Sequence, residues 1–147
     1  MAGSILVYGF GNPGRGDDGL GIALAEEIER RDLPDVQVET NYQLNAEDAL
    51  LISEKRLVVF VDASKGISEG YALTRLQPSH TIGFTTHAMS PSSVLALCEE
   101  LYQKSPETYL LEIAGQEWEM VERLSDKAKA YLQAALLSIL SLLQERG

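Results

Sequence analysis

The sequence predicts an α/β fold, a three-layer sandwich in which a twisted, mostly parallel sheet lies between helices on both faces. Apolar runs typical of strands alternate with helical patterns along the chain. The run Leu57–Val61 is apolar at every position, as expected of a strand that is buried on both faces. The length of 147 residues suits one domain, which we place at residues 1–147.

The first half of the chain begins this alternation of strands and helices. Its expected elements are, in order, a strand at 4–9, a loop at 11–16, a helix at 18–31, a strand at 36–40, a helix at 46–54 and a strand at 57–61. The first strand is almost entirely apolar and ends in glycine, and the first helix has apolar residues at helical spacing on one face. Asn45 is expected to cap the second helix, and Asp62 to end the third strand.

The second half continues the alternation and ends in a long helix. Its expected elements are a strand at 71–76, a β-prone polar segment at 81–86, a helix at 91–103, a strand at 108–113 and a helix from 126 to about 145. Ser90 precedes Pro91, and a serine cap followed by proline at the first helical position is a strong helix start. Ser125 is expected to cap the last helix.

The composition excludes several classes of protein. The chain has 12 basic and 22 acidic residues, a net charge of −10, so a phosphate backbone would repel it and we expect no nucleic-acid partner. No apolar run approaches the ~20 residues of a membrane helix, so we expect no membrane partner. Cys98 is the single cysteine and cannot form an internal disulfide, and no secretory leader pattern is present. We therefore expect a cytoplasmic protein, and a monomer.

The glycine-rich loop after the first strand matches, by spacing, a dinucleotide-binding fingerprint. Gly9, Gly11 and Gly14 fit the pattern GxGxxG. The third glycine of that fingerprint should lie inside a helix, whereas here proline and further glycine prolong the loop. Asp17 and Asp18 then stand at the helix start, where they would repel a pyrophosphate. Nucleotide binding is therefore the weakest of the functions considered.

Titratable residues fall where a parallel sheet with helices on both faces places its site, at the carboxyl ends of the strands. Asp17 and Asp18 open the first helix, and since one of them suffices as a cap, the other is left for function. Asp62 follows a strand that should be central, although it could also simply hold a turn. His87 precedes the helix at 91, and by itself it would be an ordinary loop histidine.

Two carboxylates and one imidazole together form an O, O, N ligand set. Such a set suits a divalent ion such as Ni, Zn, Fe or Mn, and it leaves coordination positions open, as catalytic and transfer sites do. The residues alone do not decide between Asp17 and Asp18. Other nucleophiles are weaker candidates: Cys98 lies at helical spacing among apolar residues and is expected in the core, and no helix follows Ser64 to make a nucleophile elbow.

Three blocks of sequence carry a family resemblance. They are Gly9–Pro13 with Gly16–Gly21, then Asp62–Ala63, then His87–Ser90, with a weaker match at Gly115–Gln116 and Trp118. Through these blocks most of the chain resembles the hydrogenase maturation proteases, the endopeptidases that process the large subunit of nickel–iron hydrogenases. The metal-contacting positions of that family fall on Asp18, Asp62 and His87. Asp17 is then expected to be the helix cap.

The resemblance implies an aspartic-type endopeptidase with Asp18, Asp62 and His87 as its catalytic and metal-contacting residues. Its expected partner is a hydrogenase large-subunit precursor, from which it removes a C-terminal extension after nickel insertion. The nickel is expected to come with the substrate protein and to be recognised there. The alternative from another class is a non-catalytic, metal-sensing or chaperone-like binding module that uses the same three ligands.

Overall fold

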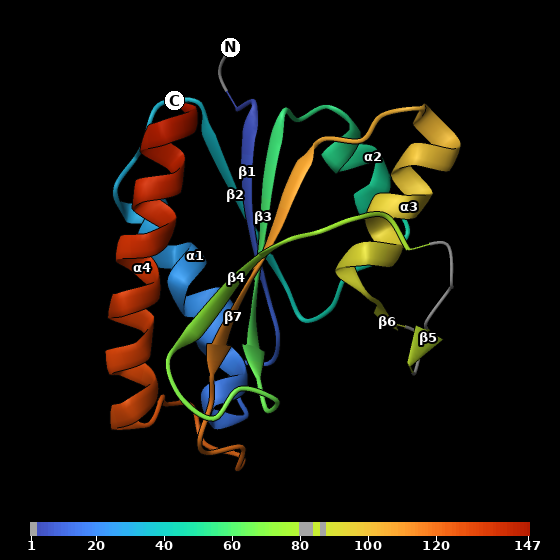
Figure 1. The fold of residues 1–147 in the computed structure, drawn as a ribbon. Helices are drawn as coiled ribbons and strands as arrows, with labels where there is room; N and C mark the ends of the chain where they lie inside the picture. The colour runs from blue at the N-terminus through green and yellow to red at the C-terminus, as the bar shows by residue number, and fades with distance from the viewer. Residues whose placement is uncertain (1–2, 80–83, 86–87) are drawn as a thin grey trace.

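A five-stranded sheet forms the middle layer of the molecule (Figure 1). The structure is a computed structural model, and it describes residues 3–79, 84–85 and 88–147. The strands lie in the order β2 (Val36–Asn41), β1 (Ile5–Phe10), β3 (Leu57–Ser64), β7 (Glu107–Ala114) and β4 (Tyr71–Arg75). Neighbouring strands are parallel from β2 to β7, and β4 is antiparallel to β7. This confirms the mostly parallel sheet.

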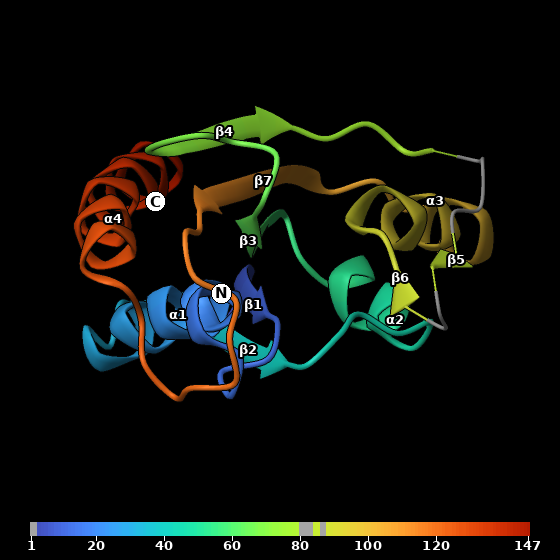
Figure 2. The ribbon, with the colours of Figure 1, turned by 90° about the horizontal axis from the view of Figure 1, so that it is seen from below.

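Helices cover both faces of the sheet, which confirms the three-layer arrangement (Figure 2). One face carries α1 (Leu20–Arg30) and α4 (Asp126–Arg146), and the other carries α2 (Asp48–Ser53) and α3 (Pro91–Tyr102). A short antiparallel pair, β5 (Phe84–Thr85) and β6 (Ala88–Met89), lies before α3. No helix in the described ranges is both long enough and apolar enough to cross a membrane.

The apolar pattern of β3 accounts for its central position. Val59 and Val61 face the α1–α4 layer, and Val58 and Phe60 face the α2–α3 layer, so both faces of the strand are buried. Each fully buried side chain of this size contributes roughly 1.5–3 kcal/mol to folding. A strand covered on both faces has no polar face, which is why the run is continuous rather than alternating.

The predicted starts of the last two helices are confirmed by their capping hydrogen bonds. The Ser90 hydroxyl accepts from the backbone N–H of Ser93 at 3.1 Å, and the Ser125 hydroxyl accepts from the N–H of Ala128 at 3.2 Å. Cys98 is buried in the core of the α2–α3 layer, as expected.

Three predicted boundaries differ from the structure by two residues or more. The first helix begins at Leu20, because residues 16–19 form a separate 3₁₀ turn, η1 (Gly16–Gly19). The second helix begins at Asp48, and Asn45 does not cap it: the Asn45 N–H instead donates to the Asp48 carboxylate at 2.8 Å. Asp62 does not end β3, because the strand pairs with β7 as far as Ser64. Of the β-prone segment 81–86, residues 84–85 form β5 and the rest lies outside the described residues.

Candidate active site

Asp62 lies near the carboxyl end of the central strand, in the region where the sequence predicted a site. It is the third residue from the end of β3 and lies in register with Glu112 of β7. Because side chains alternate along a strand, Asp62 is on the same face as Phe60, towards the α2–α3 layer. It is only partly exposed. The strand therefore holds a carboxylate at the carboxyl edge of the sheet, beside a second acidic residue.

Asp18 lies at the same end of the sheet, in the turn that follows the neighbouring strand β1. It lies in η1, which follows β1 and contacts β3. Its carboxylate accepts a hydrogen bond from the backbone N–H of Asn12 at 2.8 Å, which fixes it against the loop after β1. β1 and β3 are adjacent, and the charge of Asp18 is near enough to act on Asp62. The structure thus brings two of the three predicted site residues together.

The proximity of Asp18 and Asp62 depends on glycines in α1 and β1. A Cβ on Gly21 would lie 2.3 Å from the Val61 carbonyl oxygen and 2.7 Å from that of Phe10. A Cβ on Gly9 would lie 2.1 Å from the Gly21 carbonyl oxygen. Real Cβ atoms do not approach oxygen so closely, so only glycine lets the start of α1 pack directly against the ends of β1 and β3.

Burial and neighbouring carboxylates give Asp62 an unusually high pKa. Burial has the largest effect on the pKa of Asp62, and the nearby charges of Asp18 and Glu112 act in the same direction. A hydrogen bond from the Ala63 backbone opposes them, and the net result raises the pKa to about 7. Carboxylates held together in this way are stabilised by a cation between them or by a shared proton. The arrangement therefore suits contact with a positively charged group.

The third predicted ligand lies outside the described residues. Since His87 is at 86–87, one of the ranges without a description, its position relative to Asp18 and Asp62 stays a prediction. Among residues 3–79, 84–85 and 88–147, no three His, Cys, Asp or Glu side chains are grouped so that they could hold a metal ion. The two carboxylates are thus an incomplete set by themselves, and Asp18 with Asp62 fits a metal only together with a further donor.

The expectation that Asp17 caps the first helix was wrong. Asp17 is fully buried, and its carboxylate accepts hydrogen bonds from residues about 100 positions further along the chain. The donors are the N–H groups of Gln116 (2.7 Å), Glu117 (2.9 Å) and Ser125 (2.7 Å) and the hydroxyl of Ser125 (2.7 Å). Burial by itself would raise the pKa of Asp17, but these four bonds outweigh it and lower the pKa. Asp17 therefore fixes the loop before α4 and supports η1, while Asp18 is left for the site.

Ser64 and Lys65, near this end of the sheet, and Cys98, nearer the opposite end, have structural partners. The Ser64 hydroxyl accepts from the N–H of Gly66 at 3.0 Å, so it holds the turn after β3. The ammonium group of Lys65 lies 4.9 Å from the centroid of the Trp118 ring, a cation–π contact. The Cys98 thiol is buried and donates to the Lys104 carbonyl at 3.2 Å. Sequence reasoning did not identify Gly21 or Glu112 as site residues, because their roles depend on which strands become neighbours.

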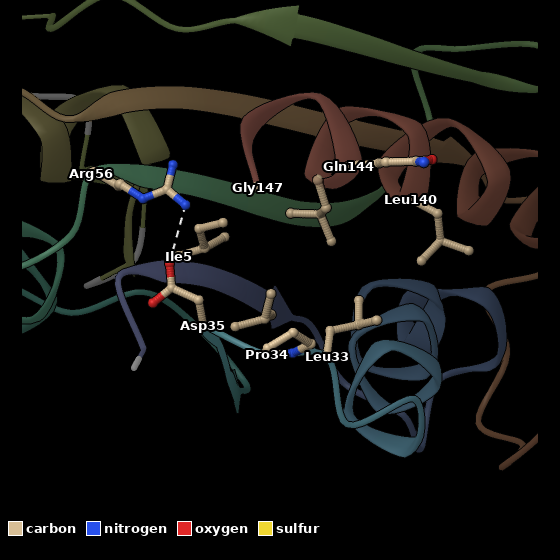
Figure 3. A pocket seen from close by; sticks show the side chains of 10 residues that line it. Ile5, Leu33, Pro34, Asp35, Arg56, Leu140, Gln144 and Gly147 are labelled. Atoms are coloured by element: carbon tan, nitrogen blue, oxygen red, sulfur yellow. Dashed lines mark hydrogen bonds and ion pairs between the residues drawn. The ribbon is translucent and has the colours of Figure 1, made fainter. Parts of the chain in front are cut away.

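A pocket of about 590 Å³ lies at the opposite, amino end of the sheet (Figure 3). Its walls are largely aliphatic, and Leu140 and Leu33 project into the space between α4 and the chain after α1. Its charged residues, Asp35 and Arg56, form an ion pair at 3.1 Å and so neutralise each other. The charges in this pocket are therefore paired, whereas Asp18 and Asp62, at the opposite end of the sheet, have the same sign.

Comparison with solved structures finds the same fold in known proteins. The chain superposes on the hydrogenase maturating endopeptidase HybD from E. coli with a TM-score of 0.81 and 22% identity, over 100% of this chain and 94% of HybD. The nickel–iron hydrogenase maturation protease HycI from Thermococcus kodakarensis KOD1 gives a TM-score of 0.75 and 25% identity, over 97% and 93% of the two chains. No protein-family model and no curated protein matches the sequence. The structural matches confirm the predicted fold and the resemblance seen in the sequence.

Proposed function

We propose that this chain, whose fold matches that of solved hydrogenase maturation proteases, is itself a maturation endopeptidase. Its substrate would be the precursor of a nickel–iron hydrogenase large subunit, from which it removes the C-terminal extension after nickel insertion. One observation carries the proposal. The two carboxylates at the carboxyl edge of the sheet, Asp18 and Asp62, lie close enough to interact, and they come from different elements of this fold.

In this proposal the nickel ion belongs to the substrate. Asp18 and Asp62 contact it through their carboxylates, and His87 supplies the nitrogen donor. The repulsion between the two carboxylates is relieved when a cation lies between them, so recognition would favour a precursor that already carries nickel. The backbone N–H of Asn12 keeps the Asp18 carboxylate in place while this contact forms.

The same donor set predicts weak metal binding by the protein alone. Two carboxylates and one imidazole, without cysteine, hold a divalent ion less firmly than a closed site with four ligands. Purified protein treated with a chelator is therefore expected to lose any nickel or zinc that it carries. If it kept one equivalent of metal through that treatment, an ordinary metallopeptidase with its own resident ion would be the better assignment.

The decisive experiment is to mix the protein with a nickel-loaded large-subunit precursor and to measure the mass of the product. The wild type is expected to shorten the precursor, and the same precursor without nickel should stay intact. Asp62→Asn and His87→Ala are expected to be inactive while keeping the thermal melt of the wild type. Asp32→Asn is the matched control: Asp32 is exposed with a positive φ of 47°, which asparagine adopts readily.

The same experiment also shows whether the protein is an enzyme or a binding module. A metal-sensing or chaperone-like module would form a complex with the nickel-loaded precursor and leave its mass unchanged. Binding without cleavage by the wild type would therefore overturn the proposed endopeptidase. Cleavage by His87→Ala at the wild-type rate would overturn the role given to the imidazole and leave the peptidase itself in place.

A further inference from the structure

Two shallow hollows join into one groove between α1 and α4. The first has a volume of about 180 Å³ and the second about 200 Å³. They are continuous, because Ala23, Glu26 and Leu124 line both of them. We call this feature the α1–α4 groove. It lies on the face where α1 and α4 run side by side (Figures 1 and 2).

The groove begins beside the candidate active site. Its near end is lined by Pro13, Gly16 and Gly19, and the last two belong to η1, the turn that carries Asp18. Asn12 donates to the Asp18 carboxylate and the next residue, Pro13, lines the groove. The loop of residues 12–19 thus carries the Asp18 carboxylate and also lines the near end of the groove. Because Asp62 faces the α2–α3 layer and the groove lies between α1 and α4, a polypeptide bound at Asp18 and Asp62 would cross this loop to enter the groove.

The lining of the groove suits a peptide with both apolar and charged side chains. Ile22, Ala23 and Leu124 give it apolar walls near the site, and Glu26 and Glu122 stand beside them. Neither glutamate makes an ion pair within the described ranges, so both are free to meet a cationic group. With a net charge of −10, the whole chain also favours basic partners electrostatically.

The groove also has three basic residues in its lining, of which one is paired. Arg30 pairs with Glu27 at the far end and is thereby neutralised. Arg123 at the near end and Lys129 at the far end make no ion pair in the part of the chain that the structure describes. The groove as a whole is therefore not uniformly acidic, and the acidic contact that it offers is the one at Glu26 and Glu122.

The wall formed by the loop before α4 is held in a fixed position. The N–H of Gly16 donates to the Val121 carbonyl at 2.7 Å, and the N–H of Asp17 donates to the Glu117 carbonyl at 2.8 Å. These bonds add to the four that the buried Asp17 carboxylate accepts. A binding surface that is already ordered loses less conformational entropy when a partner binds.

The same loop exposes apolar side chains beside the groove. Met120 is 79% exposed and Val121 is 38% exposed, next to Glu122 in the groove wall. Large apolar side chains that are exposed to water next to a hollow are typical of surfaces that another chain covers. The groove and the exposed residues are thus two separate observations at one place.

We propose that the α1–α4 groove binds an extended segment of the substrate polypeptide next to the bond that is cleaved. The segment would place aliphatic side chains against Ile22, Ala23 and Leu124 and a basic side chain opposite Glu26 and Glu122. Met120 would contact the surface of the same substrate outside the groove. This inference rests on the proposed function, because it takes the substrate to be a polypeptide bound at Asp18 and Asp62.

The test compares the kinetics of precursor trimming for charge-reversal variants. Glu26→Lys is expected to raise KM about fivefold with kcat unchanged, because the lost contact lies outside the reacting atoms. Glu26→Lys combined with Glu122→Lys should raise KM further, and Met120→Ser should raise it by a smaller factor. Glu29→Lys is the matched control, since Glu29 is on the same helix and exposed but does not line the groove.

A binding measurement that does not depend on cleavage accompanies the kinetics. Amide hydrogen exchange of the Asp62→Asn variant, with and without nickel-loaded precursor, should show protection at residues 22–26 and 119–129. An unchanged KM in Glu26→Lys together with no protection there would overturn the groove while leaving the endopeptidase intact. An equal rise in KM in Glu29→Lys would also overturn the groove as the binding site, because the change in net charge, and not a contact in the groove, would then be the cause. If the wild type cleaves no precursor, the proposed function is wrong, and this inference, which rests on it, is wrong as well.

Discussion

Asp17 and Ser125, 108 positions apart in the chain, are joined by two hydrogen bonds of 2.7 Å each. Ser125 donates both its backbone N–H and its hydroxyl proton to the Asp17 carboxylate. The same hydroxyl oxygen accepts from the N–H of Ala128 and so caps α4. One serine therefore connects the turn that carries Asp18 to the start of the last helix.

Asp17→Asn is expected to lower the free energy of unfolding by about 2–4 kcal/mol, because buried donors lose their acceptor. An amide has one oxygen, and its NH₂ group would face N–H or O–H donors that the carboxylate now satisfies. Urea unfolding followed by circular dichroism measures the change, with Asp32→Asn as the control. A loss below about 0.5 kcal/mol, the usual range for a surface substitution, would show that the four bonds contribute little.

The contribution of Asp17 to stability should depend on pH in one direction. Its hydrogen bonds lower the pKa below the ordinary value of 3.8, so the folded state favours the ionised form. The unfolded chain takes up the proton first as the pH falls, and stability that is fully present above about pH 4 is then lost. The difference in unfolding free energy between the wild type and Asp17→Asn is expected to be constant from pH 7 to 5 and to shrink at pH 3. A difference that stays the same at pH 3 would contradict this role.

Replacing Asp48 by asparagine is expected to affect stability in the opposite way to Asp17→Asn. Its Oδ2 atom accepts from the Tyr8 hydroxyl at 3.0 Å and from the Asn45 N–H at 2.8 Å, and burial raises the pKa of Asp48. Asparagine can keep both bonds at one oxygen and removes a charge that the folded state disfavours. At pH 7 we expect Asp48→Asn to match or exceed wild-type stability and Asp48→Ala to lose about 1–3 kcal/mol. Equal losses in the two variants would contradict the argument.

Gly21→Ala is expected to destabilise the fold by about 1–3 kcal/mol and to reduce precursor trimming. Alanine is ordinarily the better helix former, but here its Cβ would lie 2.3 Å from the Val61 carbonyl oxygen. The start of α1 would have to move away from β3, and Asp18 would move with it. Gly66→Ala is the control, since the nearest atom to its Cβ, the Ser64 hydroxyl oxygen, is 3.6 Å away. Thermal melts of both variants measure the change in stability, and their trimming rates measure the change in activity.

The sequence was sufficient to predict the layers of the fold and the position of Asp62 near the carboxyl end of the central strand. The continuous apolar run at 57–61 needs two covered faces, which fixed β3 at the centre, and the serines at 90 and 125 marked two helix starts. These signals are local, and each depends on residues within one turn or one strand. The position of Asp62 at the carboxyl edge followed from that strand and from the general rule for parallel sheets.

The role of Asp17 could not be predicted, because its partners lie about 100 residues away. An acid at the start of a helix is ordinarily a cap, and the sequence contains no sign that this carboxylate instead accepts hydrogen bonds from Ser125. The extension of β3 past Asp62 likewise depends on pairing with β7. The contact of Gly21 with Val61 depends on the packing of a helix against a strand. Each of these features is set by tertiary contacts.

The bond between Asp17 and Ser125 also has a consequence for the order of events during synthesis. All five strands of the sheet precede residue 115, so a chain that stops before Ser125 contains the complete set of strands. Such a chain lacks two of the four donors to the Asp17 carboxylate, because both come from Ser125 at the start of the last helix. The turn that carries Asp18 therefore gains its last two bonds only when Ser125 has been made, although its bonds to residues 116, 117 and 121 can form earlier. A partly synthesised protein would have all the strands of the sheet before it has every contact that holds this turn.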